Sequence, residues 1–275
     1  MKFTKMHGCG NDYIYIDCRD GVPEDIAALA VCLGDRHKGI GGDGIILICS
    51  SDKADFKMRI FNADGSEGKM CGNGIRCVAK YVFDKGLSDS RNLLIDSLSG
   101  VKVISISDGA QPGDDVTWIS VDMGEPVVES VDETLTLSDG KSLVGSSVSM
   151  GNPHFVVFTD GDLSDDLVLG TGPEAERHSR FPQRSNIEFA RVISPSEIEM
   201  RVWERGSGET MACGTGACAT AVAALRKGLV SGDVTVRLRG GDLHISLDDR
   251  GHVIMTGPAE TSFEGTIKDL KRSQL

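Results

Sequence analysis

Two short segments combine a cysteine with glycines at a point where a loop leads into a helix. Cys71 begins Cys-Gly-Asn-Gly and Cys213 begins Cys-Gly-Thr-Gly, and an apolar stretch follows each of them. The first turn of a helix leaves about four backbone N–H groups without helical partners and carries partial positive charge. Such a turn favours a thiolate over a thiol, and its glycines let an anion approach the backbone. Each segment therefore predicts a reactive cysteine beside a carboxylate-binding turn.

The two segments belong to a repeat that covers most of the chain. Residues 58–74 align without a gap with residues 200–216, and both ranges contain Met, Arg, Glu, Cys and two glycines at the same places. Fainter matches continue outward, and one of them pairs Asn11 with Asn152, 141 positions later. A nearly constant offset across each half predicts two homologous domains related by pseudo-twofold symmetry.

The duplication suggests one chemical role for both cysteines. If the two halves face one another, both helix N-termini point into one interdomain cleft and present a thiol to each side of a bound amino acid. Inversion at an α-carbon requires a base on one face and an acid on the other. Cys71 and Cys213 would exchange these roles with the direction of reaction, and backbone N–H groups would stabilise the carbanion charge that develops on the carboxylate. The pair would share one proton and titrate as a dyad.

Hydrophobic patterning predicts an α+β fold for each half. The expected order is strands, a short helix, two more strands, a longer helix and a run of strands. Helices are expected over residues 23–33, from Cys71 to Lys85 and from Cys213 to Lys227, and the acidic run 160–166 is expected to be a solvated loop. The helix after Cys213 is apolar nearly all round, so we expect a curled mixed β-sheet to enclose it.

Composition excludes several other classes of protein. The 275 residues include 29 basic and 41 acidic side chains, which give a formal charge of −12. This charge argues against binding to nucleic acid or to an anionic membrane surface. Because no apolar run could span a bilayer and the N-terminus lacks the apolar core of a signal peptide, we expect a cytoplasmic protein.

Cofactor and metal motifs are not found in the sequence. None of the eight cysteines forms a Cys-x-x-Cys pair, which makes a zinc ribbon or a thioredoxin-like motif improbable. The glycine-rich stretch 39–44 leads into a strand rather than a helix, and the stretch 206–210 lacks the P-loop lysine. No lysine context predicts a pyridoxal phosphate site, so we expect chemistry without metal or cofactor.

Taken together, these residues resemble the diaminopimelate epimerases over nearly the whole chain. Five motifs in order carry the resemblance, at residues 6–12, 61–67, 71–77, 150–154 and 204–216. Proline racemases share the two-cysteine arrangement but not the loops at 62–67 and 204–210. The resemblance implies conversion of LL-diaminopimelate to the meso form, on the path to lysine and cell-wall peptide, without metal or cofactor.

The resemblance also implies roles for individual residues. Cys71 and Cys213 would be the acid/base pair, and His154 and Glu204 would tune their ionisation. Some members of the family have glutamine where this chain has Gly44. Some have a tyrosine implicated in dimerisation where this chain has Phe263. The substrate-binding residues would be Asn11, Asn62, Gly72, Asn73, Asn152, Asn186, Glu204, Arg205, Gly214 and Thr215, of which Gly72, Asn73, Gly214 and Thr215 would hold the reacting carboxylate.

The implied architecture is two similar domains, each a strand layer around a central helix, with the C-terminal tail returning to the first. We expect the first domain to comprise residues 1–115 and 262–275, the second to comprise 116–261, and the chain to form a homodimer. Two alternatives stay open. One is a racemase of another amino acid, such as proline or histidine. The other is a non-catalytic zwitterion-binding protein or a thiol-based metal or redox module.

Overall fold

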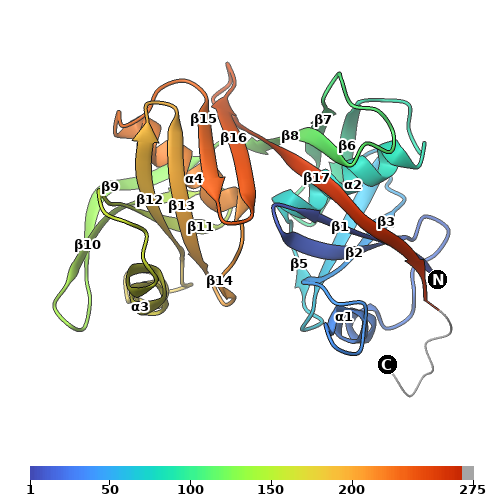
Figure 1. Cartoon of the computed structure of the whole chain (residues 1–275), viewed down its shortest axis with the longest axis horizontal. Coiled ribbons are helices and arrows are strands. Elements are labelled where there is room, and N and C mark those ends of the chain that lie inside the picture. Colours follow the sequence, from blue (N-terminus) through green and yellow to red (C-terminus); the bar gives the residue numbers. More distant parts are fainter. Residues whose placement is uncertain (268–275) are drawn as a thin grey trace. The chain divides into compact units, whose positions relative to one another are not determined.

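The structure is a computed structural model that describes residues 1–267, and the last eight residues of the predicted first domain, 268–275, lie outside the described residues (Figure 1). The chain divides into two compact units. Unit 1 comprises residues 1–121 and the described residues from Gly257 onward, and unit 2 comprises residues 122–256. Each unit combines a mixed strand layer with two helices, which confirms the predicted α+β fold with two similar domains. No helix within residues 1–267 is long and apolar enough to cross a membrane.

Unit 1 is a mixed strand layer whose last strand pairs with its first. In this layer β2 runs parallel to β3, and β4 runs parallel to β6, whereas the pairs β1–β2, β3–β4, β6–β7 and β7–β8 are antiparallel. Residues 260–266 near the end of β17 pair with β1. The strands are β1 (Lys2–Gly8), β2 (Asn11–Asp17), β3 (Gly44–Cys49), β4 (Phe56–Asn62), β5 (Glu67–Gly68), β6 (Asn92–Asp96), β7 (Lys102–Ile106), β8 (Val116–Gly124) and β17 (Val253–Thr266).

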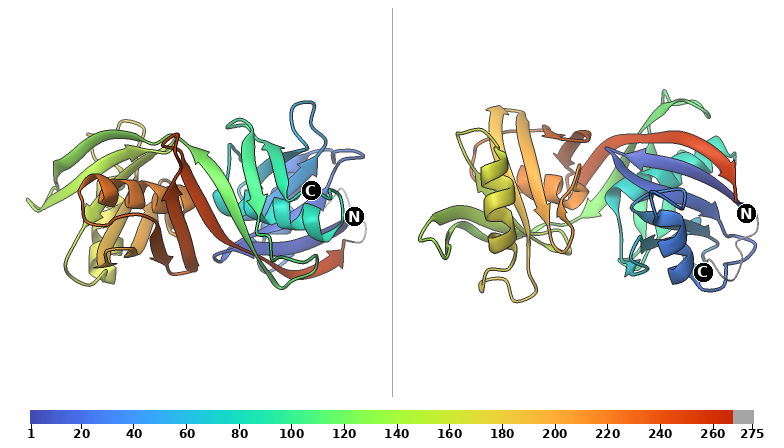
Figure 2. Two further views of the ribbon diagram at one scale, coloured as in Figure 1. Left: turned by 90° about the horizontal axis from the view of Figure 1, so that it is seen from above. Right: turned by 60° about the horizontal axis from the view of Figure 1, so that its bottom comes forward.

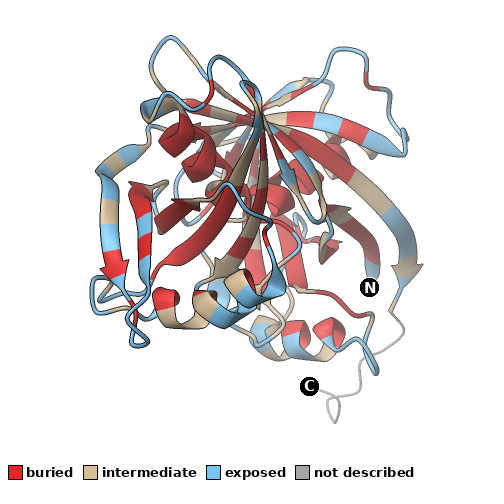
Figure 3. Ribbon diagram, turned by 60° about the vertical axis from the view of Figure 1, so that its left-hand side comes forward, coloured by how far each residue is buried: buried red, intermediate tan, exposed pale blue. Residues whose placement is uncertain are grey.

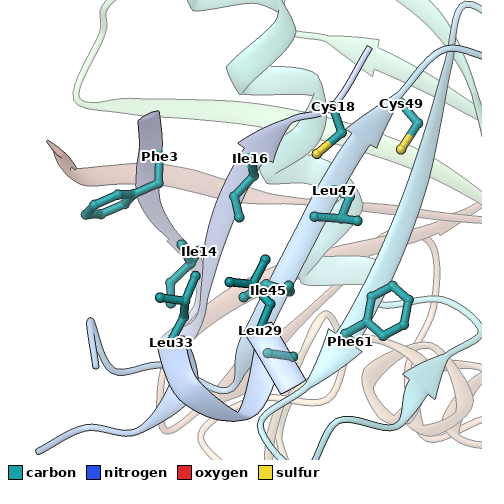
Figure 4. Close-up of a cluster of buried hydrophobic side chains, with 11 residues drawn as sticks. Phe3, Ile14, Ile16, Cys18, Leu29, Leu33, Ile45, Leu47, Cys49 and Phe61 are labelled. Carbon is teal, nitrogen blue, oxygen red and sulfur yellow. The ribbon is translucent and has the colours of Figure 1, made fainter. Parts of the chain in front are cut away.

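Two helices cover opposite faces of this layer. Helix α2 (Gly72–Asp84) is buried at 11 of its 13 positions, and the hydroxyl of Tyr15 on β2 donates a hydrogen bond to the carbonyl of Gly74, 3.4 Å away. Helix α1 (Ile26–Gly34) packs on the other face, where Leu29 and Leu33 meet Ile45 and other apolar residues of the strands (Figure 4). Because both faces of the sheet are covered, β3 is buried at all six positions.

The predicted start of α1 at Pro23 was wrong by three residues. The carboxylate of Asp25 accepts a hydrogen bond from the backbone N–H of Ala28, at 3.2 Å, and Asp25 is therefore the N-cap. An N-cap residue lies outside the helix proper, so the helix begins at Ile26.

Unit 2 repeats this order of elements. Strand β11 runs parallel to β12 and β13 runs parallel to β15, as do the corresponding pairs of unit 1. The elements are β9 (Val127–Thr136), β10 (Ser142–Ser149), β11 (Pro153–Phe158), α3 (Asp165–Glu176), β12 (Asn186–Ser194), β13 (Glu197–Glu204), β14 (Gly208–Glu209), α4 (Gly214–Arg226), β15 (Val234–Leu238) and β16 (Gly241–Leu247).

The helices of unit 2 also lie on opposite faces of the strands. Helix α4 is buried at ten positions, as its apolar sequence predicts, and buried residues are concentrated in the strands and helices of each unit (Figure 3). Helix α3 lies against β12 and β13 (Figure 1, Figure 2). Between α3 and the strands, Phe155, Ile187 and Phe189 form an apolar cluster with Val168 and their neighbours.

The prediction of a loop over residues 160–166 was wrong at its end. Asp165 and Asp166 form the first turn of α3, and the hydroxyl of Ser164 caps the helix by accepting a hydrogen bond from Leu167 N–H at 3.3 Å. Acidic side chains are stabilising in the first turn, where the helix dipole is positive, so an acidic run is compatible with a helix start.

Candidate active site

Cys71 and Cys213 have the same local structure in their respective units. Each is the N-cap of its helix with extended backbone angles, and its Sγ accepts a hydrogen bond from the N–H three residues later at 3.3 Å. The donors are Gly74 and Gly216. A Cβ on Gly74 would lie 2.6 Å from Ile46 Cδ1, so a side chain does not fit there without displacing its neighbour. Each sulfur is thereby held against the positive end of a helix.

An amide oxygen faces the sulfur of Cys71. Sγ lies 3.1 Å from Oδ1 of Asn11, and Nδ2 of the same amide donates to Oδ2 of Asp43 at 2.7 Å. Arg36 donates to the other carboxylate oxygen of Asp43, at 3.0 Å. Because a carboxylate only accepts hydrogen bonds, it turns the amide nitrogen toward itself and the amide oxygen toward the cysteine. Asn11 is thus arranged to accept a hydrogen bond from the thiol of Cys71.

The turn after Cys71 lies over a buried cation. Asn73 is buried, and its Oδ1 accepts a hydrogen bond from Arg76 at 2.8 Å. The guanidinium of Arg76 has no solvent exposure and also donates to the carbonyls of Gly72 and Pro258, both at 3.2 Å. Its positive charge adds to that of the helix N-terminus. This turn is therefore suited to a carboxylate ligand.

Asn62 and Gly44 face each other across β3 and β4. The two residues are register partners, and Nδ2 of Asn62 donates to the hydroxyl of Ser66 at 3.1 Å. A Cβ on Gly44 would lie 2.0 Å from the carbonyl oxygen of Phe61. A glutamine at position 44 therefore requires a different local backbone, and in this chain only main-chain atoms stand there.

A series of hydrogen bonds connects Cys213 with His154 on β11. Oγ1 of Thr215 lies 3.5 Å from Sγ of Cys213 and accepts a hydrogen bond from Nδ2 of Asn152 at 3.2 Å. Oδ1 of Asn152 lies 3.1 Å from Nε2 of His154, whose Nδ1 lies 2.7 Å from a carboxylate oxygen of Glu188. Both His154 and Glu188 are fully buried. Unit 2 thus places His154 two hydrogen-bonded residues away from the cysteine.

The surroundings of Cys213 favour its neutral form. Burial raises the pKa of this thiol well above its ordinary value, the carboxylates of Glu204 and Glu188 raise it further, and hydrogen bonds from Thr215 and Gly216 oppose them. Burial also raises the pKa of Glu204, against a hydrogen bond from the hydroxyl of Thr210 at 2.5 Å. A cationic group beside Glu204 would lower both pKa values, so this environment suits a ligand with an ammonium group.

Asn186 and Arg205 shape the loop between β13 and β14. Oδ1 of Asn186 accepts a hydrogen bond from the N–H of Arg205, and Nδ2 donates to the carbonyl of Pro153, both at 2.9 Å. The Arg205 side chain is exposed and donates to the carbonyl of Gln183 at 3.2 Å. The amide of Asn186 therefore positions the backbone at Arg205 and Pro153. The guanidinium of Arg205 has further N–H groups with which it could bind a ligand.

Sequence reasoning missed three buried or paired charges that support these groups. Asp43 lies in the glycine-rich stretch 39–44, and Arg76 lies within the motif at 71–77. Glu188 stands between Ile187 and Phe189 in a buried strand, where a lone carboxylate is a recognisable signal. The remaining named residue, Phe263, is 49% exposed on β17, with its ring centroid 5.9 Å from that of Phe3.

A family model described as diaminopimelate epimerase matches residues 3–129 and 146–262. The chain belongs to the diaminopimelate epimerase family. A diaminopimelate epimerase of Phocaeicola vulgatus is 47% identical over 279 residues, which cover 98% of each chain. One of Methanococcus maripaludis is 46% identical and covers 97% of this chain and 99% of that one. The family consists of isomerases that act on small molecules, as the sequence predicted.

Solved structures of proteins with other names have a fold similar to that of this chain. A phenazine biosynthesis protein of the PhzF family from Bacillus anthracis aligns with a TM-score of 0.71 at 16% identity, covering 98% of this chain and 99% of that one. A hydroxyproline epimerase from Agrobacterium vitis aligns with a TM-score of 0.68 at 17% identity, covering 96% and 91%. At these identities the likeness concerns the two-domain fold alone.

Proposed function

We propose that this protein interconverts LL- and meso-diaminopimelate by a two-base mechanism without a cofactor, in the synthesis of lysine and peptidoglycan precursors. The observation that carries the proposal is the duplicated cysteine turn. In both units a cysteine caps a buried helix and accepts a hydrogen bond from a glycine N–H at 3.3 Å. Family membership supplies the substrate, since the relatives that match nearly the whole chain are diaminopimelate epimerases.

The mechanism requires one sulfur on each side of the α-carbon. One cysteine, as thiolate, removes the α-proton and becomes a thiol, while the other, as thiol, delivers its proton to the opposite face and becomes a thiolate. The C–H bond that breaks and the C–H bond that forms balance, so the substrate is inverted with no change in oxidation state. The reverse reaction exchanges the roles of Cys71 and Cys213.

The carboxylate of the reacting centre would be held by the helix N-termini. Backbone N–H groups around Gly72, Asn73, Gly214 and Thr215 provide donors, and the buried Arg76 adds positive charge below the first turn. These groups would stabilise the negative charge that moves onto the carboxylate when the α-proton leaves. Asn11 accepts from the thiol of Cys71, which suits that cysteine to the acid role before the proton is delivered.

The distal amino-acid end of diaminopimelate would be recognised by separate groups. The carboxylate of Glu204 suits an ammonium, and the exposed guanidinium of Arg205 suits a carboxylate. We place Asn62, Asn152 and Asn186 in the same site, the last through its hold on the Arg205 backbone. Because this recognition needs a second charged end, proline and histidine should be poor substrates.

A substrate panel tests this proposal directly. Purified protein is incubated separately with LL-diaminopimelate, meso-diaminopimelate, L-proline and L-histidine, and the stereoisomers are resolved by chiral chromatography. The proposal predicts interconversion of the two diaminopimelates only. Racemisation of proline or histidine at comparable rates would favour an amino-acid racemase, and tight binding of diaminopimelate without turnover would favour a binding protein.

The proposal includes a cytoplasmic homodimer. Phe263 is the candidate contact for the dimer, because a large apolar ring that is half exposed on a strand is a common feature of protein interfaces.

A further inference from the structure

Glu176, the last residue of helix α3, is a buried carboxylate that the two-base mechanism does not use. Its Oε1 accepts a hydrogen bond from the backbone N–H of Gly206 at 3.0 Å, and its Oε2 accepts one from the indole N–H of Trp203 at 3.1 Å. Two exposed guanidinium groups also lie near the carboxylate, that of Arg184 at 3.5 Å and that of Arg177 at 3.9 Å. Both buried contacts of the carboxylate are thus made to the hairpin of β13 and β14.

The loop of this hairpin is a tight turn with one left-handed residue. The N–H of Ser207 donates to the carbonyl of Glu204 at 3.2 Å and closes a four-residue turn. Of the two central residues, Gly206 has a φ of +81° and Arg205 has a φ that is not positive. These signs are those of a type II turn, in which the third residue has a φ of about +80°. A type II turn differs from type I in the direction of its central peptide group, which here joins Arg205 to Gly206.

Two side chains hold the peptide groups on either side of the Arg205 α-carbon. Asn186 accepts a hydrogen bond from the N–H of Arg205, and Glu176 accepts one from the N–H of Gly206. Because peptide groups are planar, fixing both of them fixes φ and ψ of the residue between them. The direction in which the Arg205 side chain leaves the backbone is then set as well.

The two holding residues are connected to each other. The backbone carbonyl of Glu176 accepts a hydrogen bond from the N–H of Ser185 at 3.2 Å, and Ser185 directly precedes Asn186 at the start of β12. Helix stability does not explain the carboxylate, because an acidic side chain is unfavourable at the negative C-terminal end of a helix. Its hydrogen bonds to the hairpin are the stabilising contacts of this buried charge.

We propose that Glu176 is a positioning residue for recognition of the distal carboxylate of diaminopimelate. By accepting from the N–H of Gly206, it selects the direction of the central peptide group and so holds Arg205 in the conformation that binds this carboxylate. The inference rests on the proposed function, because it deepens the assignment of Arg205 to the distal end of the substrate. It gives Glu176 no part in proton transfer at the α-carbon.

Two substitutions disturb the turn by independent routes. Glu176→Met keeps a side chain of similar length and removes both acceptors, so the N–H of Gly206 loses its partner. Gly206→Ala keeps the carboxylate and penalises the positive φ. A Cβ at position 206 would meet no atom within 4 Å, so this substitution acts through the backbone alone. The matched control is Glu174→Met on the same helix, which removes a carboxylate that accepts from the N–H of Ser138.

The decisive readout is the turn itself, in protein without substrate. NMR measures the nuclear Overhauser effect between Hα of Arg205 and the N–H of residue 206. This effect is strong in a type II turn, where the two hydrogens are close, and weak when the central peptide group has flipped. We expect a strong effect in the parent and in Glu174→Met, and a weakened effect in both Glu176→Met and Gly206→Ala.

Turnover of diaminopimelate connects the turn with recognition. Glu176→Met and Gly206→Ala should each raise KM by about tenfold with little change in kcat, as expected for groups coupled in one hydrogen-bond network. In an Arg205→Met background, Glu176→Met should raise KM by less than about twofold, because the side chain that it positions is already gone. Circular dichroism and thermal melting establish that each variant is folded.

Three results would overturn the inference. The first is a nuclear Overhauser effect in Glu176→Met as strong as in the parent. The second is an equal rise in KM from Glu176→Met with and without the Arg205 guanidinium. The third is a fall in kcat as large as the rise in KM, which would mean that the substitution damages the site as a whole. Because the NMR measurement needs no substrate, these failures are distinct from a failure of the parent protein to interconvert diaminopimelate, which would instead refute the proposed function.

Discussion

Oδ1 of Asn11 lies 3.1 Å from Sγ of Cys71, and the amide that carries it is held by Asp43. The repeat partner, Asn152, holds the corresponding place in unit 2, but there the amide donates through Nδ2 to the hydroxyl of Thr215. The same residue type at the same repeat position thus presents an acceptor to the sulfur in one unit and a donor to the neighbouring hydroxyl in the other. The two cysteines are equivalent in backbone geometry and different in the hydrogen-bonding groups that the repeat-related asparagines present to them.

Replacing Asp43 with asparagine should weaken the hold on Asn11. The new amide can donate to Asn11 as well as accept from it, so the Asn11 amide can turn its nitrogen toward Cys71. We expect faster alkylation of Cys71 at neutral pH in a Cys213→Ala background, and turnover lowered by about tenfold when both cysteines are present. Asp20→Asn, at an exposed position, is the matched control. Unchanged reactivity of Cys71 would show that Asp43 does not orient Asn11.

Removing the charge of Glu204 should make Cys213 easier to ionise. The Glu204 carboxylate raises the pKa of Cys213, so Glu204→Gln should lower that pKa and move the alkylation profile of Cys213 to lower pH. The measurement uses substrate-free protein in the Cys71→Ala background. Glu197→Gln, at the other end of β13, should leave the profile in place. A shift to higher pH in Glu204→Gln would mean that its hydrogen bonds outweigh its charge.

Loss of the Arg205 guanidinium should affect binding of the distal carboxylate and not the chemistry at the α-carbon. A hydrogen bond between charged groups contributes about 1.5–3 kcal/mol, so Arg205→Met should raise KM for diaminopimelate by about 10–100-fold with a smaller change in kcat. Arg250→Met, at a distant exposed ion pair, is the control. 2-Aminopimelate lacks the distal ammonium, so its KM should rise with Arg205→Met and change little with Glu204→Gln. Equal increases in KM from the two substitutions would contradict this account of distal recognition.

The exposed ring of Phe263 should matter for assembly. If β17 forms part of a dimer interface, Phe263→Glu places a charge in an apolar contact and should shift the protein toward monomers. Light scattering coupled to size exclusion measures this at several protein concentrations. Lys57→Glu, on the exterior of β4, is a control for added negative charge. Equal masses for the parent and the Phe263 variant would remove this residue from the interface.

Much of the fold could be predicted because the repeat constrained it. The cysteine turns, the helices after them and the α+β class follow from local patterns that occur twice. The ends of the helices were less certain, since Asp25 and Ser164 act as caps through single hydrogen bonds that no periodicity reveals. Acidic residues at 165–166 suited a loop and a first helical turn equally.

The supporting charges of the site could not be predicted, because they depend on contacts between distant segments. Asp43 meets Asn11 across β2 and the loop before β3, and Glu188 meets His154 across two parallel strands. The register of strands decides these contacts, and a one-residue slip would turn either side chain to the opposite face. The sequence alone shows only that a carboxylate stands in an apolar strand.

The exchange of the α-proton with solvent tests the central claim most directly. LL- or meso-diaminopimelate is incubated in D₂O with the parent protein, with Cys71→Ala, with Cys213→Ala and with Cys32→Ala, whose cysteine lies within α1 and outside both cysteine turns. Deuterium at the α-carbon and the stereoisomer ratio are measured together. The account predicts deuterium incorporation with inversion by the parent and Cys32→Ala, and no interconversion by either catalytic variant. Near-normal interconversion by Cys71→Ala or Cys213→Ala would contradict it.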